Sequence, residues 1–109
     1  MSYPAALALT VATEVPVYAA ALAAASQAPP GRTAAAAVIV NCVTHPPLWW
    51  FLRHVPLAAY WPALTCAEAA VVLAEGWLTA RLLRLRGPAP YAASTAANAV
   101  SVLAGLLLL

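Results

Sequence analysis

The chain has 109 residues, enough for about one domain, and 65% of them are hydrophobic. Only 7% are charged, against about 25% in a typical soluble domain, and these charges are five arginines and three glutamates. The composition excludes a soluble domain, gives no extended basic face for nucleic acid, and indicates an integral protein of the lipid bilayer.

Four segments are long and apolar enough to cross a bilayer, which takes about 20 residues. In chain order they cover residues 5–25, 33–52, 61–83 and 91–109. The connections "QAPPGR", "RHVPLAAYWP" and "RLRGPAP" contain prolines and are short, so consecutive spans must run antiparallel. We therefore predict an all-α fold, a four-helix transmembrane bundle of two antiparallel helical hairpins that forms a single membrane domain over residues 1–109.

The arginines predict the orientation of the chain. The first and third connections carry four of them: Arg32, Arg81, Arg84 and Arg86. The second connection carries only Arg53. Because loops rich in arginine stay in the cytoplasm, we expect both termini outside the plasma membrane of a bacterial cell. An outer aromatic belt is predicted from Trp49, Trp50, Tyr60 and Trp61.

Each predicted span carries polar residues near its middle, at helical spacings that place them on one face. In chain order these residues are Thr10, Glu14 and Tyr18; Asn41 and His45, with Thr44 beside them; Thr65, Glu68, Glu75 and Thr79; Ser94, Asn98 and Ser101. Four inward polar faces imply a shared polar interior. Small residues four apart in the last span, from Ala93 to Gly105, predict close helix packing.

The three glutamates are the strongest functional signal. A charged side chain at the bilayer centre costs about 2.5–3.5 kcal/mol on insertion scales, so each must find a partner, be protonated or face water. Acidic residues spaced through a membrane are typical of a proton or cation path. The predicted ion-binding or proton-binding residues are Glu14, Tyr18, Asn41, His45, Glu68, Glu75, Asn98 and Ser101.

Position along the spans predicts three pairs. These are His45 with Glu68, Glu14 with Asn98, and Asn41 with Glu75. Prolines follow two of the ionisable residues: Pro16 comes after Glu14, and Pro46 and Pro47 come after His45. A proline removes a backbone hydrogen bond, and both a kink that opens a pocket and a purely structural kink fit this pattern.

Metal binding is a second interpretation of the same residues. Imidazole and carboxylate groups suit several divalent metals, which makes His45, Glu14 and Glu68 candidate ligands and a divalent metal the candidate cofactor. No Glu-x-x-His or His-x-x-x-His pair is present on one helix. We predict no catalytic residue, because no nucleophile, base and orienting group can be assigned.

Three functions fit these observations. The first is a small membrane protein that binds and translocates a cation, either a proton or a divalent metal. The second is a non-catalytic subunit or scaffold of a larger membrane complex, and the third is an intramembrane metal-dependent enzyme. The expected partners are the bilayer and either further copies of the chain or a larger membrane complex.

Four short motifs carry a resemblance. They are "EVP" at residues 14–16, N-x-x-T-H-P at Asn41–Pro46, two glutamates and a glycine at Glu68, Glu75 and Gly76, and A-N-x-x-S-x-x-x-G at Ala97–Gly105. Together they resemble a group of small four-span bacterial membrane proteins over most of the chain. The resemblance implies this architecture and a recurring polar core, and it implies no activity.

Overall fold

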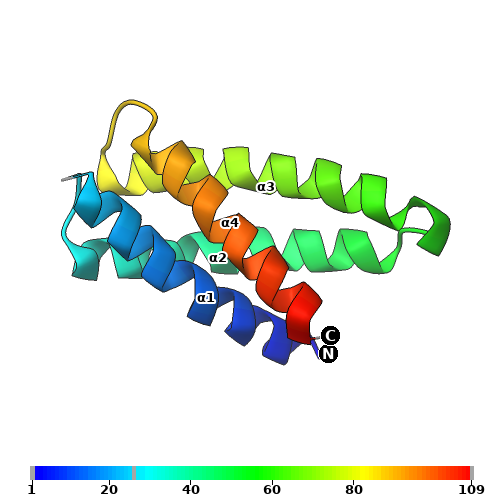
Figure 1. The fold of residues 1–109 in the computed structure, drawn as a ribbon. Helices are drawn as coiled ribbons and strands as arrows, with labels where there is room; N and C mark the ends of the chain where they lie inside the picture. The colour runs from blue at the N-terminus through cyan, green and yellow to red at the C-terminus, as the bar shows by residue number, and fades with distance from the viewer. Residues whose placement is uncertain (1, 26, 109) are drawn as a thin grey trace.

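A computed structural model describes residues 2–25 and 27–108 of the chain. Four long helices follow one another: α1 (Tyr3–Ala24), α2 (Pro30–Arg53), α3 (Tyr60–Leu83) and α4 (Ala89–Leu108), with a short 3-10 helix, η1 (Leu57–Ala59), before α3 (Figure 1). Each long helix is apolar and long enough to cross a membrane. The predicted all-α bundle is confirmed, and each helix boundary lies within three residues of its predicted position.

The helices form a closed ring, because α1 packs against α2 and α4 while α3 packs against the same two helices. In Figure 1, α1 and α4 lie across the α2–α3 pair at an angle. Both termini and η1 lie at one end, here called the η1 end, and the other two connections lie at the opposite end, here called the arginine end. The molecule is 42 Å long, which matches a bilayer of about 40–45 Å including its headgroups.

Local chemistry explains where the helices begin and continue. The Ser2 hydroxyl accepts a hydrogen bond from the Ala5 backbone N–H at 3.3 Å, which caps the start of α1. α2 runs without interruption through Pro46 and Pro47. Both prolines are exposed on the outer surface whereas His45, the preceding residue, is buried, so this stretch combines an apolar outer side with a polar inner one.

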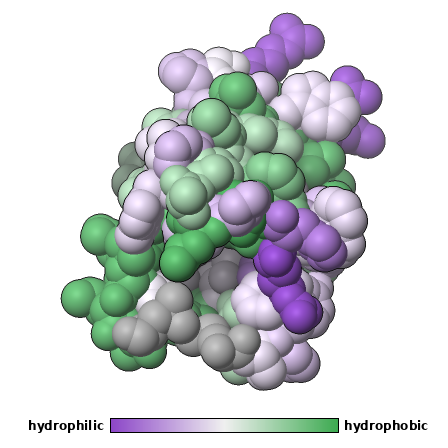
Figure 2. All heavy atoms as spheres, turned by 90° about the vertical axis from the view of Figure 1, so that its right-hand side faces the viewer, coloured by the Kyte–Doolittle hydropathy of each residue, from purple (hydrophilic) through white to green (hydrophobic). Residues whose placement is uncertain are grey.

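The polarity of the molecule is inverted relative to a soluble protein. Its buried polar residues are Glu14, Thr33, Asn41, His45, Glu75, Thr79, Ser94 and Asn98. Large apolar side chains are exposed instead, among them Val43, Trp50, Phe51, Leu73 and Trp77. Figure 2 views the η1 end, where strongly hydrophilic side chains gather only at the right and upper right of a mostly apolar or weakly polar face. This is the distribution expected of a protein surrounded by lipid.

The two halves of the bundle are packed differently. In the half toward the arginine end, a buried cluster joins residues of all four helices: Tyr18, Leu22, Ala36, Ala37, Leu83, Ala93 and Ala97. Of the small residues spaced four apart on α4, Ala93 and Ala97 face this core, whereas Ser101 and Gly105 line the cavity of the other half. The half toward the η1 end has few fully buried apolar side chains and contains a partly open cavity.

Gly76 allows α3 and α4 to approach closely. A Cβ atom added at this glycine would lie 2.5 Å from Cδ1 of Tyr91 and 3.0 Å from its Cγ. The Tyr91 ring therefore rests directly on the α3 backbone. Because Gly76 follows Glu75 in sequence, this contact also sets how near α4 comes to that carboxylate.

Replacing Gly76 with alanine is expected to destabilise the bundle. Overpacking at such a contact costs about 1–3 kcal/mol, and circular dichroism during unfolding in mixed detergent micelles measures the loss. Gly105→Ala is the matched control, because no atom of the described part of the chain lies within 4 Å of its added Cβ. Equal stability of Gly76→Ala and wild type would contradict the close α3–α4 packing.

Candidate functional site

Glu75 on α3 accepts hydrogen bonds from all three other helices. Tyr18 Oη on α1 donates to Oε1 at 2.8 Å, and Asn98 Nδ2 on α4 donates to the same oxygen at 2.9 Å. Thr44 Oγ1 on α2 donates to Oε2 at 2.6 Å. Glu75 is only 1% exposed, so these three bonds satisfy both of its oxygens inside the protein.

Further hydrogen bonds tie α4 to its neighbours on either side. Ser101 Oγ donates to Glu14 Oε2 on α1 at 2.6 Å. Ser94 Oγ donates to the Val72 backbone carbonyl on α3 at 2.8 Å. The polar face of α4 therefore contacts both neighbouring helices. It donates hydrogen bonds to Glu14 on α1 and to Glu75 on α3.

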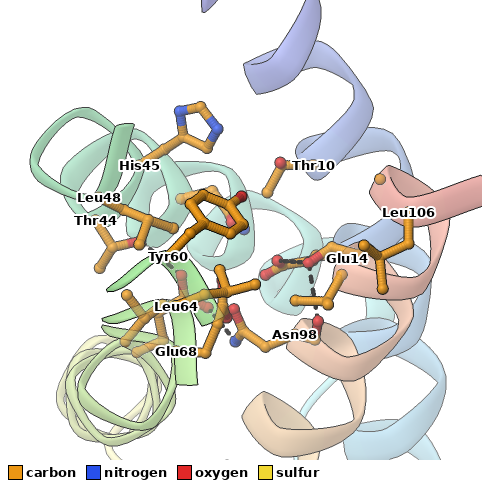
Figure 3. A pocket seen from close by; sticks show the side chains of 16 residues that line it. Thr10, Glu14, Thr44, His45, Leu48, Tyr60, Leu64, Glu68, Asn98 and Leu106 are labelled. Atoms are coloured by element: carbon orange, nitrogen blue, oxygen red, sulfur yellow. Dashed lines mark hydrogen bonds between the residues drawn. The ribbon is translucent and has the colours of Figure 1, made fainter. Parts of the chain in front are cut away.

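A cavity of about 150 Å³ lies beside this network (Figure 3). Its polar lining residues come from all four helices: Thr10, Glu14, Asn41, Thr44, His45, Tyr60, Glu68, Glu75, Asn98 and Ser101. The structure thus brings together seven of the eight predicted site residues. The eighth, Tyr18, is not among the lining residues and instead holds Glu75 from the arginine-end side.

Four buried polar atoms on the cavity's lining residues have no hydrogen-bond partner among residues 2–25 and 27–108. They are Glu14 Oε1, Asn41 Oδ1, His45 Nδ1 and Glu68 Oε2. An unsatisfied buried polar atom costs about 1–3 kcal/mol, so four of them around one cavity are unfavourable unless the cavity binds something polar. This distinguishes Glu14 and Glu68 from the fully satisfied Glu75.

The His45 ring is held in an aromatic cluster. Its centroid lies 5.4 Å from that of Tyr3 on α1, and it stacks on Trp49 with centroids 6.2 Å apart. Trp49 and Tyr60 were predicted as members of an aromatic belt, yet Trp49 packs on His45 and Tyr60 lines the cavity. Trp50 and Trp61 are exposed, as a belt requires.

The sequence did not single out three residues of the site. Thr44 was noted beside Asn41 and His45 but was not counted as a site residue, although it follows Asn41 by three residues, a spacing that places both on one helical face. Tyr3 and Tyr60 were missed because each stands at the first residue of its helix, where the predicted spans had not yet begun.

The three predicted pairs do not form hydrogen bonds among the described residues. Asn98 donates to Glu75 rather than to Glu14, and Ser101 takes its place at Glu14. Asn41 Nδ2 donates to the Ala37 backbone carbonyl of its own helix at 2.8 Å. The pairing failed because depth along a span does not fix how each helix is rotated and tilted against its neighbours.

The candidate metal ligands His45, Glu14 and Glu68 all line the cavity. Within residues 2–25 and 27–108, however, no group of three His, Cys, Asp or Glu side chains is placed to hold a metal ion. The geometry therefore lends no support to a metal centre built from these side chains alone.

Comparisons with protein-family models, curated proteins and solved structures gave no match. The resemblance to small four-span bacterial membrane proteins stays a prediction. What the cavity binds must therefore be argued from its own geometry.

Removing the phenolic hydroxyl of Tyr18 is expected to weaken the bundle through Glu75. Tyr18→Phe should lower the free energy of unfolding by about 1 kcal/mol, the net value of one hydrogen bond. In a Glu75→Ala background the same change should cost much less, because the acceptor is already gone. The free energies of unfolding of the wild type, both single variants and the double variant are measured in mixed micelles. If Tyr18→Phe lowers the free energy of unfolding equally with and without Glu75, the Tyr18–Glu75 hydrogen bond is contradicted.

Proposed function

We propose that this chain binds a cation inside the membrane, in the cavity lined by Glu14, Glu68 and Glu75, and translocates it. The single observation that carries the proposal is the set of four buried, unpartnered polar atoms on the cavity's lining residues. A bundle that served only for packing would be expected to satisfy these groups internally.

The charge of the lining residues favours a cation over an anion. Three carboxyl groups line the cavity, and no arginine is among the lining residues. An ionised carboxylate only accepts hydrogen bonds and carries negative charge, so the site repels anions and attracts cations or protons. The weak screening at membrane depth strengthens both effects.

The shape of the cavity supports entry from the η1 end. Its lining residues include Tyr60, the first residue of α3, and Leu106, near the end of α4. Toward the arginine end, Tyr18 and Leu22 are fully buried and close the bundle. If arginine-rich loops face the cytoplasm, a cation enters from outside and meets the Glu75 network, which has to open for passage.

The residues divide into roles on this proposal. Glu14 and Glu68 bind the cation, because each has a buried oxygen without a hydrogen-bond partner. His45 relays protons beside them through its free ring nitrogen. Asn41 and Asn98 orient the neighbouring groups.

A scaffold is the second candidate, and the saturated Glu75 network is the observation that favours it. Three hydrogen bonds to one carboxylate are what a purely structural element needs. On this alternative the chain docks further copies of itself or a larger complex in the plasma membrane through its apolar surface. The scaffold accounts for Glu75 but not for the free oxygens of Glu14 and Glu68.

Neutralising Glu14 or Glu68 is expected to impair cation transport strongly while the bundle still assembles. The purified protein is reconstituted in liposomes, and uptake of protons, Mn²⁺ and methylammonium is measured separately. Glu14→Gln and Glu68→Gln should each lower the rate or affinity for the transported cation by roughly tenfold or more, the value of a hydrogen bond to a charged group. In the wild type, binding should weaken as the pH falls, because protonation removes the negative charge.

Thr79→Val is the matched control for this experiment. Thr79 is buried and its hydroxyl is unpartnered, but it is not among the residues that line the cavity. If the two glutamine variants handle every probe cation as the wild type does, the carboxylates have no such role and the scaffold function is favoured.

A further inference from the structure

The cavity is larger than a bare metal ion requires. A volume of about 150 Å³ corresponds to roughly five water molecules at about 30 Å³ each. Bound metal ions are instead coordinated by several protein ligand atoms at metal–ligand distances of about 2.0–2.6 Å. The described residues contain no group of three side chains placed to do this. The available space fits a small organic group better than a naked ion.

The free polar atoms of the cavity require hydrogen-bond donors. Glu14 Oε1, Asn41 Oδ1 and Glu68 Oε2 are three oxygen acceptors without a partner. A protonated primary amine supplies three N–H donors and a positive charge, and it can reach acceptors directly or through a bridging water. The donor count and the charge of an ammonium group therefore complement this set.

The other lining residues are hydrocarbon. Leu48, Leu64, Val71, Val102 and Leu106 share the cavity wall with the carboxylates. A fully hydrated inorganic ion gains nothing from such a wall. A cation that carries an alkyl group satisfies both kinds of lining.

A groove on the outside of the bundle, between α3 and α4, adjoins the cavity. It has a volume of about 560 Å³, and four of its lining residues also line the cavity: Leu64, Glu68, Asn98 and Val102. Its remaining walls are mostly apolar and include Trp61, Ala69, Val72, Ala99 and Leu103. Glu68 thus stands where the polar cavity meets an apolar groove on the lipid-facing surface.

From these shared lining residues we infer that the cation is an amphiphilic amine, a deduction that rests on the proposed cation-binding function. Its ammonium group occupies the cavity beside Glu14 and Glu68, and its alkyl tail lies in the α3–α4 groove. Such a molecule reaches the site sideways from the bilayer. The site then recognises a lipophilic organic cation rather than an inorganic one.

Binding of n-alkylammonium ions tests the inference. The full-length protein in nanodiscs is titrated calorimetrically with methylammonium, butylammonium and octylammonium, and with octanol and octyltrimethylammonium as probes that lack the charge or the N–H donors. Octylammonium should bind best, and Glu68→Gln should weaken its binding by roughly tenfold or more. Binding that is unchanged in Glu68→Gln would show partition into lipid only and overturn the inference, as would equal binding of octyltrimethylammonium.

Bulky substitutions in the groove separate tail binding from ammonium binding. Ala99 on α4 and Ala69 on α3 are exposed positions on opposite walls of the groove. Ala99→Trp and Ala69→Trp should each weaken octylammonium binding by roughly tenfold, the loss expected from a few unburied methylene contacts, and leave methylammonium binding unchanged. Normal octylammonium binding by both variants would place the tail elsewhere and overturn the inference.

The matched control is Ala70→Trp, which fills the groove between α2 and α3 instead. That groove shares Thr44, Leu48 and Val71 with the cavity but contains no carboxylate. Ala70→Trp should bind every alkylammonium as the wild type does. Equal weakening by Ala70→Trp and Ala99→Trp would indicate a general effect of the added ring and overturn the assignment to the α3–α4 groove.

The two proposals fail in different ways. If protons or Mn²⁺ are taken up in a Glu68-dependent manner and no alkylammonium binds, the amine inference is wrong and the proposed function stands. If no probe cation depends on Glu14 or Glu68, both are wrong.

Discussion

The hydrogen bonds that reach Glu75 from α1, α2 and α4 determine how the four helices meet. Lipid tails are as apolar as leucine, so burial of hydrocarbon does not drive helices together in a bilayer. Close packing of small residues and bonds between polar groups must do so. A carboxylate with three donors on three helices supplies this at one point, and the Gly76–Tyr91 contact lets α4 come near enough to join.

That constraint divides the bundle into two regions. Toward the arginine end, the helices close around Tyr18, Leu22 and the alanines of α2 and α4. Toward the η1 end, the same helices leave a cavity. The hydrogen bonds to Glu75 therefore hold the packed half together, and Glu75 also lines the cavity of the other half. A structural role for Glu75 is thus compatible with a binding role for Glu14 and Glu68.

Three chemically identical side chains acquire different roles from their surroundings. Both oxygens of Glu75 are satisfied within the protein, whereas Glu14 keeps one buried oxygen without a partner and the buried Oε2 of Glu68 has none either. Glu68 also lies between the cavity and a lipid-facing groove. What each carboxylate can do thus depends on its partners and on its access to the bilayer rather than on its chemical type.

The sequence by itself determined the membrane class, the four spans and the inward direction of the polar residues. These follow from composition and from the 3.6-residue helical period, which are local properties. It also identified most of the polar residues that line the cavity, because a polar residue in a span is seldom placed toward lipid.

Only the tertiary structure decided which of those residues bond to one another and which remain free. The bonds of Asn98 to Glu75 and of Ser101 to Glu14 depend on the rotation and tilt of α4 against two neighbours. Such angles are set by contacts between residues far apart in the chain, as at Gly76 and Tyr91. No spacing within a single helix encodes them, and the cavity and its grooves follow from them.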